Sequence, residues 1–257
     1  MSSRAAPASG WTLISHRGVY NEKIAENTAA AAEEAIRRGY GMMETDLRRS
    51  ADGRIVIQHD ATFKRICGVN RQVSELTWAE IRNLKATIGG ERPLEFAEIA
   101  RIAKGRIGLW LDIKELAADR VFLSEIETVL RDNQLADRTI IGINPVATPF
   151  FRGRVTIAEN VQTLFYMPST PNLTREEILV EGLGFSLSDE SVRWGLDRGF
   201  RVIPFIGTGH YTGKDGVTPG SAVIRRLQSA GVTIFMIDSV YEPLFNSPAT
   251  PRKETNK

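Results

Sequence analysis

The sequence has few of the residues that build disulfides or soft-metal sites. Its 257 residues include one cysteine, Cys67, and three histidines. A single cysteine excludes a disulfide within the chain and any metal site built from several cysteines. This usage is typical of a reducing compartment, and we expect a cytoplasmic protein. The N-terminal residues MSSRAAPASGW also lack the apolar stretch of a signal peptide.

Long apolar runs and a surplus of one charge are also missing. No run approaches the roughly 20 apolar residues that cross a bilayer, so no membrane span is expected. The 33 Lys and Arg residues against 31 Asp and Glu residues leave a formal net charge of +2. Without a basic block, this excess does not indicate nucleic-acid binding. A small molecule is therefore the expected partner, and the oligomeric state is left open.

Short apolar runs alternate with amphipathic segments along the chain, which predicts a parallel sheet with crossover helices. Nine strands are expected, at 12–15, 42–48, 54–59, 107–114, 138–143, 162–166, 182–187, 201–206 and 233–238. Five helices are expected, at 27–38, 77–85, 118–134, 189–198 and 220–230.

One short connection decides the fold class. The turn SADGR is too short for a parallel crossover, which needs about a dozen residues. Strands 42–48 and 54–59 should therefore form an antiparallel hairpin that turns at Asp52-Gly53. The remaining eight strands predict an α/β fold, a (β/α)₈ TIM-type barrel with an extra hairpin arm after the second strand. A doubly wound open sheet is the alternative. We expect one domain over 1–257, with flexible tails at 1–10 and 246–257.

Charged and polar residues collect where the predicted strands end, which is the edge that carries the chemistry in such barrels. His16 and Arg17 follow the first strand. Glu44 and Asp46 are two residues apart, so they share one face of the second strand. Folding the hairpin about residue 52 places position 44 opposite position 60. Later strand ends and the hairpin add His59, Asp60, Asp112, Lys114 and Asp238.

These residue types suit hydrolysis of a phosphate ester. Carboxylates without cysteine favour one hard divalent cation, Mg²⁺ or Ca²⁺. His16 and His59 suit a general acid and a general base. Arg and Lys side chains suit a phosphate. A diester needs a proton removed on one side and a leaving oxygen protonated on the other, so a phosphodiester is the favoured substrate.

Several motifs resemble the glycerophosphodiester phosphodiesterase family. They are ISHRG, AENT, METDLRRSADGRIVIQHD, RQVSELTWAEIRNLKA and LDIK, which together span about residues 12 to 115. The resemblance implies a TIM-type barrel, a bound divalent cation and hydrolysis of phosphodiesters to an alcohol and a phosphomonoester. By position it implies that His16 and His59 are the catalytic pair. It also implies metal ligands at Glu44, Asp46 and Asp112, phosphate contacts at Arg17 and Lys114, and a supporting role for Glu26.

Two departures from the family pattern bear on the substrate. Asp112 stands where the family usually has Glu. The run VIPFIGTGHYTGKDGVTPGS replaces the usual Trp-Thr-x-Asn pattern, with Phe205 near the position of the Trp. A bulkier alcohol than glycerol, such as a sugar of the opine (agrocinopine-like) type, is therefore the alternative. His210 in this loop and Asp238 at the last strand end are possible substrate contacts.

Other interpretations of these residues remain open at this point. Glu26 could only bond the next helix, Lys114 could simply pair with Asp112, and Asp60 is favoured as a turn residue without a further role. A phosphodiester-binding protein without turnover is the alternative from another functional class. A phospholipase acting at membranes would need an apolar or basic docking surface, and the sequence shows none.

Overall fold

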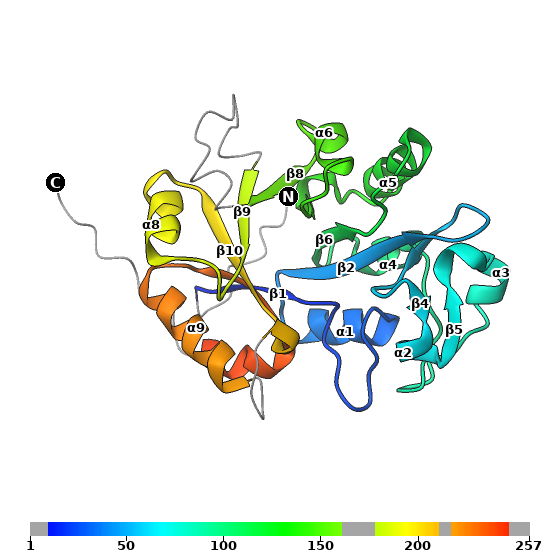
Figure 1. Ribbon diagram of the computed structural model, residues 1–257, viewed down its shortest axis with the longest axis horizontal. Helices are drawn as coiled ribbons and strands as arrows, with labels where there is room; N and C mark the ends of the chain where they lie inside the picture. Colours follow the sequence, from blue (N-terminus) through cyan, green and yellow to red (C-terminus); the bar gives the residue numbers. More distant parts are fainter. Residues whose placement is uncertain (1–9, 161–177, 211–216, 247–257) are drawn as a thin grey trace. The chain divides into compact units, whose positions relative to one another are not determined.

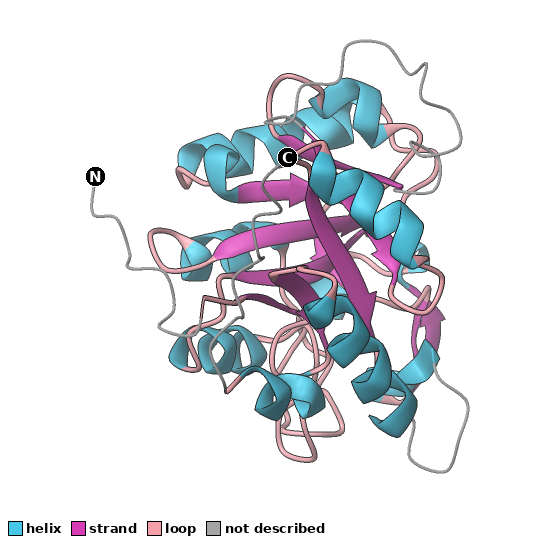
Figure 2. Cartoon of the chain, turned by 90° about the vertical axis from the view of Figure 1, so that its left-hand side faces the viewer, coloured by secondary structure: helices cyan, strands magenta, loops and turns pink. Residues whose placement is uncertain are grey.

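The computed structural model describes residues 10–160, 178–210 and 217–246, and these form two compact units. One unit comprises residues 15–158, and the other comprises residues 1–14 with 159–257. Helices and strands alternate along the chain in both units (Figures 1 and 2). Each unit is described by itself.

The unit of residues 15–158 is built on strands in the order β8-β7-β6-β2-β3, of which β8, β7, β6 and β2 are parallel neighbours. Its strands are β2 (Met42–Arg49), β3 (Ile55–Ile57), β4 (Thr62–Phe63), β5 (Val69–Gln72), β6 (Gly108–Ile113), β7 (Thr139–Ile141) and β8 (Thr156–Asn160). Its helices are α1 (Ala29–Arg37), α2 (Lys64–Cys67), α3 (Trp78–Ile81), α4 (Phe96–Ala103), α5 (Arg120–Asp132) and α6 (Ala147–Phe151). Short 3₁₀ turns are η1 (Val73–Glu75) and η2 (Ala136–Arg138).

The longer helices of this unit bury residues spaced three or four apart, as a helix on a sheet requires. They are Ala31, Ala32 and Ala35 in α1, Phe96, Ile99, Ala100 and Ala103 in α4, and Phe122, Leu123, Ile126 and Leu130 in α5. Strands β2 and β6 are buried along most of their length, because they are interior strands of a parallel sheet.

The predicted hairpin is present. β2 and β3 pair antiparallel with Leu47 opposite Ile57 and Arg49 opposite Ile55. The backbone N–H of Gln58 donates to the carbonyl of Asp46 at 3.0 Å, which extends this register toward the site. Gly53 has a φ of 84° in the turn, a conformation that glycine adopts at no steric cost. The register places position 60 opposite position 44, as the sequence predicted.

The segment between β3 and α4 folds around a small core of its own. Figure 1 shows its elements α2, α3, β4 and β5 grouped beside the β2–β3 hairpin, in cyan. We call residues 58–95 the insert. The buried residues of its core are Phe63, Val73, Leu76 and Ile81, and Val56 of β3 packs with them. This core gives the insert the rigidity to hold side chains against the neighbouring strands.

The other unit contains strands in the order β1-β11-β10-β9. Its strands are β1 (Thr12–Ser15, of which Ser15 belongs to the first unit), β9 (Ile178–Leu183), β10 (Arg201–Ile206) and β11 (Ile234–Ile237). Its helices are α8 (Asp189–Asp197), α9 (Val217–Ser229) and the 3₁₀ turns η3 (Thr208–His210) and η4 (Ser239–Phe245). Trp11, Phe235 and Phe245 pack together, with ring centroids 5.0 to 6.1 Å apart.

Most predicted elements are found within a few residues of their expected bounds, and the exceptions have physical reasons. The strand expected at 182–187 ends at Leu183, because residues 184–186 form a turn. Helix α4 was missed, because its N-cap is Glu95 rather than a usual capping residue. The side chain of Glu98 accepts a hydrogen bond from the backbone N–H of Glu95. Strand β8 was also missed. The strand expected at 162–166 and most of both predicted tails lie outside the described residues. Within the described part of the chain, no helix is long and apolar enough to span a bilayer.

Candidate active site

The chain turns sharply directly after β1, and the turn carries His16 and Arg17. Gly18 has a φ of 79°, and a Cβ atom there would lie 2.8 Å from the Cβ of Ala31, so the turn packs directly on α1. The backbone N–H of Arg17 donates a 2.8 Å hydrogen bond to Glu44 Oε2. His16 Nε2 lies 3.9 Å from the same oxygen. This turn therefore holds one imidazole beside a carboxylate of β2.

Three carboxylates meet where β2 and β6 run side by side. Asp46 lies opposite Asp112 in the parallel register, and Glu44 lies two residues earlier on the same face of β2. One oxygen from each of the three lies within 4.8 Å of the others. Lys114 Nζ lies 2.5 Å from Asp112 Oδ2 and 3.0 Å from Asp46 Oδ1. Asp46 Oδ1 is buried, and despite its short distance to Lys114 Nζ it accepts no hydrogen bond of good geometry.

The electrostatics of this cluster differ between its two buried members. Burial raises the pKa of Glu44 well above its usual value, and the charges of Asp46 and Asp112 raise it further. Burial also opposes ionisation of Asp46, but Lys114 and Arg17 outweigh it and lower the pKa of this carboxyl. Three crowded carboxylates with hard oxygen donors fit a divalent cation, which would favour the ionised form of Glu44.

Asn27, just before the start of α1, supports the cluster, a role that the sequence analysis did not predict. Its side-chain amide donates to Asp46 Oδ2 at 2.8 Å, and its Oδ1 accepts from Thr45 Oγ1 at 2.9 Å. Its own N–H donates to the Arg17 carbonyl at 2.9 Å, and its φ is 57°. The helix cap is Thr28. Asparagine tolerates this left-handed conformation better than most residues. The presence of Asn at position 27 was therefore the one sequence signal that could have pointed to this special position.

His59 follows the β2–β3 hairpin. Its carbonyl accepts two hydrogen bonds from the Arg48 guanidinium, at 2.7 and 3.0 Å. Its ring Nδ1 lies 2.7 Å from Asp60 Oδ1, a pairing that orients the imidazole. Asp60, which was interpreted as a turn residue, thus contacts His59 and also Arg65. The preceding residue, Gln58, bonds the Asp46 carbonyl through its backbone N–H, so the hairpin brings His59 near this part of β2.

Glu26 is buried, with 8% of its surface exposed, and it contacts two arginines. Arg17 Nη1 donates to its Oε1 at 3.1 Å. Arg65, from α2 in the insert, donates to both of its oxygens at 2.8 Å. Arg65 was not predicted, because nothing in the sequence places α2 beside the loop that carries Glu26.

His210 and Asp238 belong to the other unit, where each contacts a nearby residue. Asp238 Oδ2 accepts from the N–H and the hydroxyl of Thr208, at 2.7 and 2.8 Å. The His210 ring packs edge-on against Phe205, with centroids 4.9 Å apart. Residues 211–216 of the Gly-rich loop lie outside the described residues.

The comparisons with known proteins agree with this geometry. A model of the glycerophosphoryl diester phosphodiesterase family matches residues 16–136. The glycerophosphodiester phosphodiesterase of Caldanaerobacter subterraneus subsp. tengcongensis is 34% identical over 115 residues, which cover 45% of this chain and 44% of that protein. Residues 16–136 of the chain are therefore similar to the glycerophosphoryl diester phosphodiesterase family. Every residue placed around the carboxylates lies inside the matched segment.

Solved structures of phosphodiesterases share the fold. A glycerophosphoryl diester phosphodiesterase from Parabacteroides distasonis superposes with a TM-score of 0.73 at 19% identity, covering 96% of this chain and 91% of its own. A phosphodiesterase from Oleispira antarctica in complex with the product sn-glycerol-3-phosphate gives 0.71 at 18% identity, covering 92% and 97%. The predicted α/β fold of the TIM-barrel type is confirmed. The aligned segments cover between 21% and 47% of the length of the curated relatives, so the chain spans less than half of these proteins.

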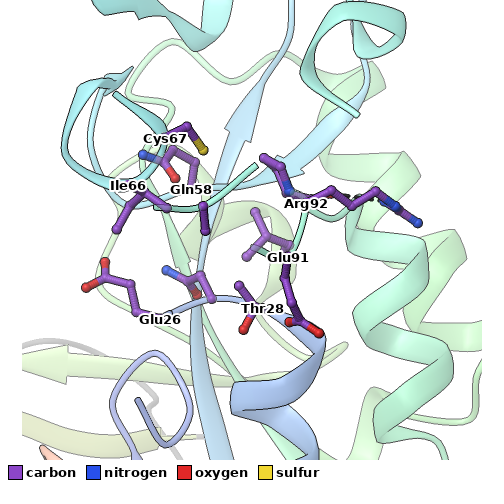
Figure 3. Close-up of a pocket in the computed structure, with 11 residues that line it drawn as sticks. Glu26, Thr28, Gln58, Ile66, Cys67, Glu91 and Arg92 are labelled. Carbon is purple, nitrogen blue, oxygen red and sulfur yellow. Dashed lines mark hydrogen bonds between the residues drawn. The ribbon is translucent and has the colours of Figure 1, made fainter. Parts of the chain in front are cut away.

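Two hollows adjoin Glu26. The one in Figure 3, which has Glu26 and Ile66 on one side and Glu91 and Arg92 on the other, has a volume of about 10 Å³. That space holds about one water molecule, so it is not a substrate pocket. The second has a volume of about 230 Å³ and lies between the loop after β1 and the insert. Its walls are mainly apolar, with Glu26 and Arg65 at its polar part, and include Tyr20, Ile24, Ala25, Ile66 and Ile88.

Proposed function

We propose that the protein hydrolyses a phosphodiester to an alcohol and a phosphomonoester, with one divalent cation bound. The observation that carries this proposal is the meeting of three carboxylates and two imidazoles within one unit. His16 Nε2 lies 3.9 Å from Glu44 Oε2, and the β2–β3 hairpin brings His59 near Asp46, whose carbonyl accepts from the N–H of Gln58 at 3.0 Å. The match of residues 16–136 to a phosphodiesterase family model supports the same reaction class.

Glu44, Asp46 and Asp112 would hold the cation, which is Mg²⁺ or Ca²⁺ because all the donors are oxygens. When bound, the cation would neutralise charge on the phosphoryl oxygens. Asp112 is the most exposed of the three side chains, at 40%, against 4% for Glu44 and 1% for Asp46. Its shorter side chain leaves space for a bridging water between carboxylate and ion.

Two proton transfers fall to the histidines. One imidazole takes the proton from the nucleophile, which is either water or a neighbouring hydroxyl of the substrate. The other gives a proton to the oxygen of the departing alcohol as the P–O bond breaks. Attack by a substrate hydroxyl would first form a cyclic phosphate, which water then opens to the monoester. Asp60 keeps the His59 ring oriented for either role.

Arg17 and Lys114 would contact the phosphate. Both are mostly buried cations, with 15% and 21% of their side chains exposed, and both lie beside the carboxylate cluster. Arg17 Nε is buried and donates no hydrogen bond, so it can donate to an anionic oxygen. Lys114 already pairs with Asp46 and Asp112, so it would bridge the ligands and the phosphate.

The pocket of about 230 Å³ is a place for the alcohol part of the substrate. Its exposed walls are mainly apolar, and Asn21, Glu26, Arg65 and Thr87 add partners for hydroxyl groups. An alcohol of the glycerol type, which has both hydrocarbon surface and hydroxyl groups, suits such a lining. The product in the Oleispira antarctica phosphodiesterase, sn-glycerol-3-phosphate, is consistent with a glycerol-type diester here.

A substrate panel tests the proposal. Purified protein with added Mg²⁺ or Ca²⁺ would be given glycerophosphocholine, a lysophospholipid and a sugar phosphodiester, with alcohol release measured for each. We expect turnover of the first two and little of the sugar ester. Preferred turnover of the sugar ester would instead support the opine-type alternative.

The same experiment separates an enzyme from a binding protein. Calorimetric binding of a diester without any turnover by the wild type would support the non-catalytic alternative. Binding retained in His16→Ala and His59→Ala, with turnover lost in both, would support the proposed reaction.

A further inference from the structure

Arg65 links two parts of the candidate site that lie far apart in the sequence. It lies in α2 of the insert, outside the main strands (Figure 1). Its Nε and Nη2 donate to Asp60 at 2.7 and 3.1 Å. Its Nη1 and Nη2 donate to Glu26 at 2.8 Å each. One planar guanidinium therefore holds two carboxylates in a fixed arrangement.

Each of these carboxylates in turn contacts a residue of the proposed reaction. Asp60 pairs with Nδ1 of His59 at 2.7 Å. Glu26 accepts from Nη1 of Arg17 at 3.1 Å, and the oxygen that receives this bond also receives one from Arg65. Arg65 thus connects to His59 through Asp60 and to Arg17 through Glu26. His59 is the proposed proton-transfer group, and Arg17 is the proposed phosphate-binding group.

We infer that Arg65 is a positioning residue, which fixes His59 through Asp60 and Arg17 through Glu26. This inference rests on the proposed function. Without the guanidinium, Glu26 keeps its full charge for Arg17 and draws that side chain away from the phosphate. Asp60 loses its anchor, so the His59 ring loses its fixed orientation. Both effects lower turnover without removing any group that reacts.

A purely structural role for Arg65 would give a different result. Its side chain is 45% exposed, but its partner Glu26 is buried, so the loss of Arg65 carries some cost in stability. Arg17 still pairs with Glu26, and the insert keeps its buried core, which limits this cost. Replacement of Arg65 should therefore lower the melting temperature modestly and leave a folded protein, and the loss of activity in that folded protein should come from geometry.

The matched control is Arg71, in the same insert. Its side chain is 49% exposed and pairs with Glu80 at 3.2 Å, away from Asp60 and Glu26. Kinetics would be measured for Arg65→Ala, Arg65→Lys and Arg71→Ala with glycerophosphocholine and the cation. We expect Arg65→Ala to lower kcat by about 10- to 100-fold, the usual effect of losing such a supporting partner. Arg65→Lys should recover only part of this, since one ammonium cannot bond both carboxylates in a fork.

Added guanidinium ion provides a second readout, which a structural role would not change. Millimolar guanidinium, too dilute to denature the protein, should raise the kcat of Arg65→Ala and leave that of Arg71→Ala unaltered. If kcat of Arg65→Ala equals that of Arg71→Ala and guanidinium has no effect, the inference is wrong. Should Arg65→Ala fail to fold, Arg65→Lys decides, because full activity in it would also overturn the inference. Absence of turnover in the wild type is the separate outcome that rejects the proposed function.

Discussion

The carboxylates of the two units have very different neighbours. Around Asp46, other carboxylates and cations crowd into a buried space, and one oxygen lacks a good hydrogen bond. Asp238, also buried, accepts two hydrogen bonds at its Oδ2 from neutral groups of Thr208. Crowded carboxylates repel one another and are stabilised by a cation between them, whereas a hydrogen bond from a neutral donor brings no such repulsion. The comparison teaches that the neighbours of a buried acid, rather than burial alone, indicate chemistry.

The largest expected effect is that of removing an imidazole beside the carboxylates. His59→Ala should lower kcat by about 10²- to 10⁴-fold, because a general acid or base contributes that much. His210→Ala, the matched change in the other unit, should leave kcat almost unaltered, since its ring packs against Phe205. Steady-state kinetics on both variants checks this. Equal losses in the two would remove the distinction between the units.

The next effect concerns cation affinity. Glu44→Gln should weaken Mg²⁺ or Ca²⁺ binding by about 10- to 100-fold, measured by calorimetric titration. Glu190→Gln on the exposed start of α8 is the control and should bind the ion as the wild type does. Unchanged affinity in Glu44→Gln would show that the cluster does not hold the ion.

The same substitution has a pH-dependent effect on stability in the presence of a chelator. The pKa of Glu44 is raised in the folded state. The contribution of Glu44 to the free energy of unfolding is therefore fully present below the unfolded pKa of about 4.3. It is lost as the pH rises through the folded pKa. Gln cannot ionise and still accepts the Arg17 N–H. The melting temperature of Glu44→Gln relative to wild type should therefore increase from pH 4 to pH 7. A constant difference would contradict the raised pKa.

A smaller effect, on stability, is expected at the turn after β1. Gly18→Ala places a Cβ 2.8 Å from that of Ala31 and strains a left-handed backbone. We expect a loss of about 1–3 kcal/mol in the free energy of unfolding. Gly53→Ala is a useful control, because it shares the positive φ but meets no atom within 4 Å. Urea unfolding should show the larger loss at Gly18, and equal losses would exclude the contact with α1.

The smallest effect is predicted for Asp238→Asn. The amide oxygen can accept both hydrogen bonds of Thr208, so the cost should stay below about 1.5 kcal/mol. Turnover should equal that of the wild type. A large loss of kcat with normal stability would place Asp238 among the reacting groups and remove the contrast on which the comparison rests.

Local rules were enough to predict the part of the site that depends on strand register. The spacing of Glu44 and Asp46 fixes a common face, and the short SADGR turn fixes the hairpin and thereby the place of His59. The roles of Asn27, Asp60 and Arg65 could not be predicted in this way. They depend on how a loop and the insert pack against the strands, and no sequence period encodes that packing. Asp238 was found at a strand end for the same local reason as Asp46, so position alone did not distinguish them.

The most direct test of the central claim follows a phosphodiester by ³¹P NMR. Metal-free protein would be mixed with glycerophosphocholine, and Mg²⁺ or Ca²⁺ would then be added. We predict that the diester resonance persists until the cation is added and is then replaced by a monoester resonance, with no such change in Asp46→Asn. Conversion at the same rate before and after the addition, or in Asp46→Asn, would contradict a cation-dependent site at the carboxylates of β2 and β6.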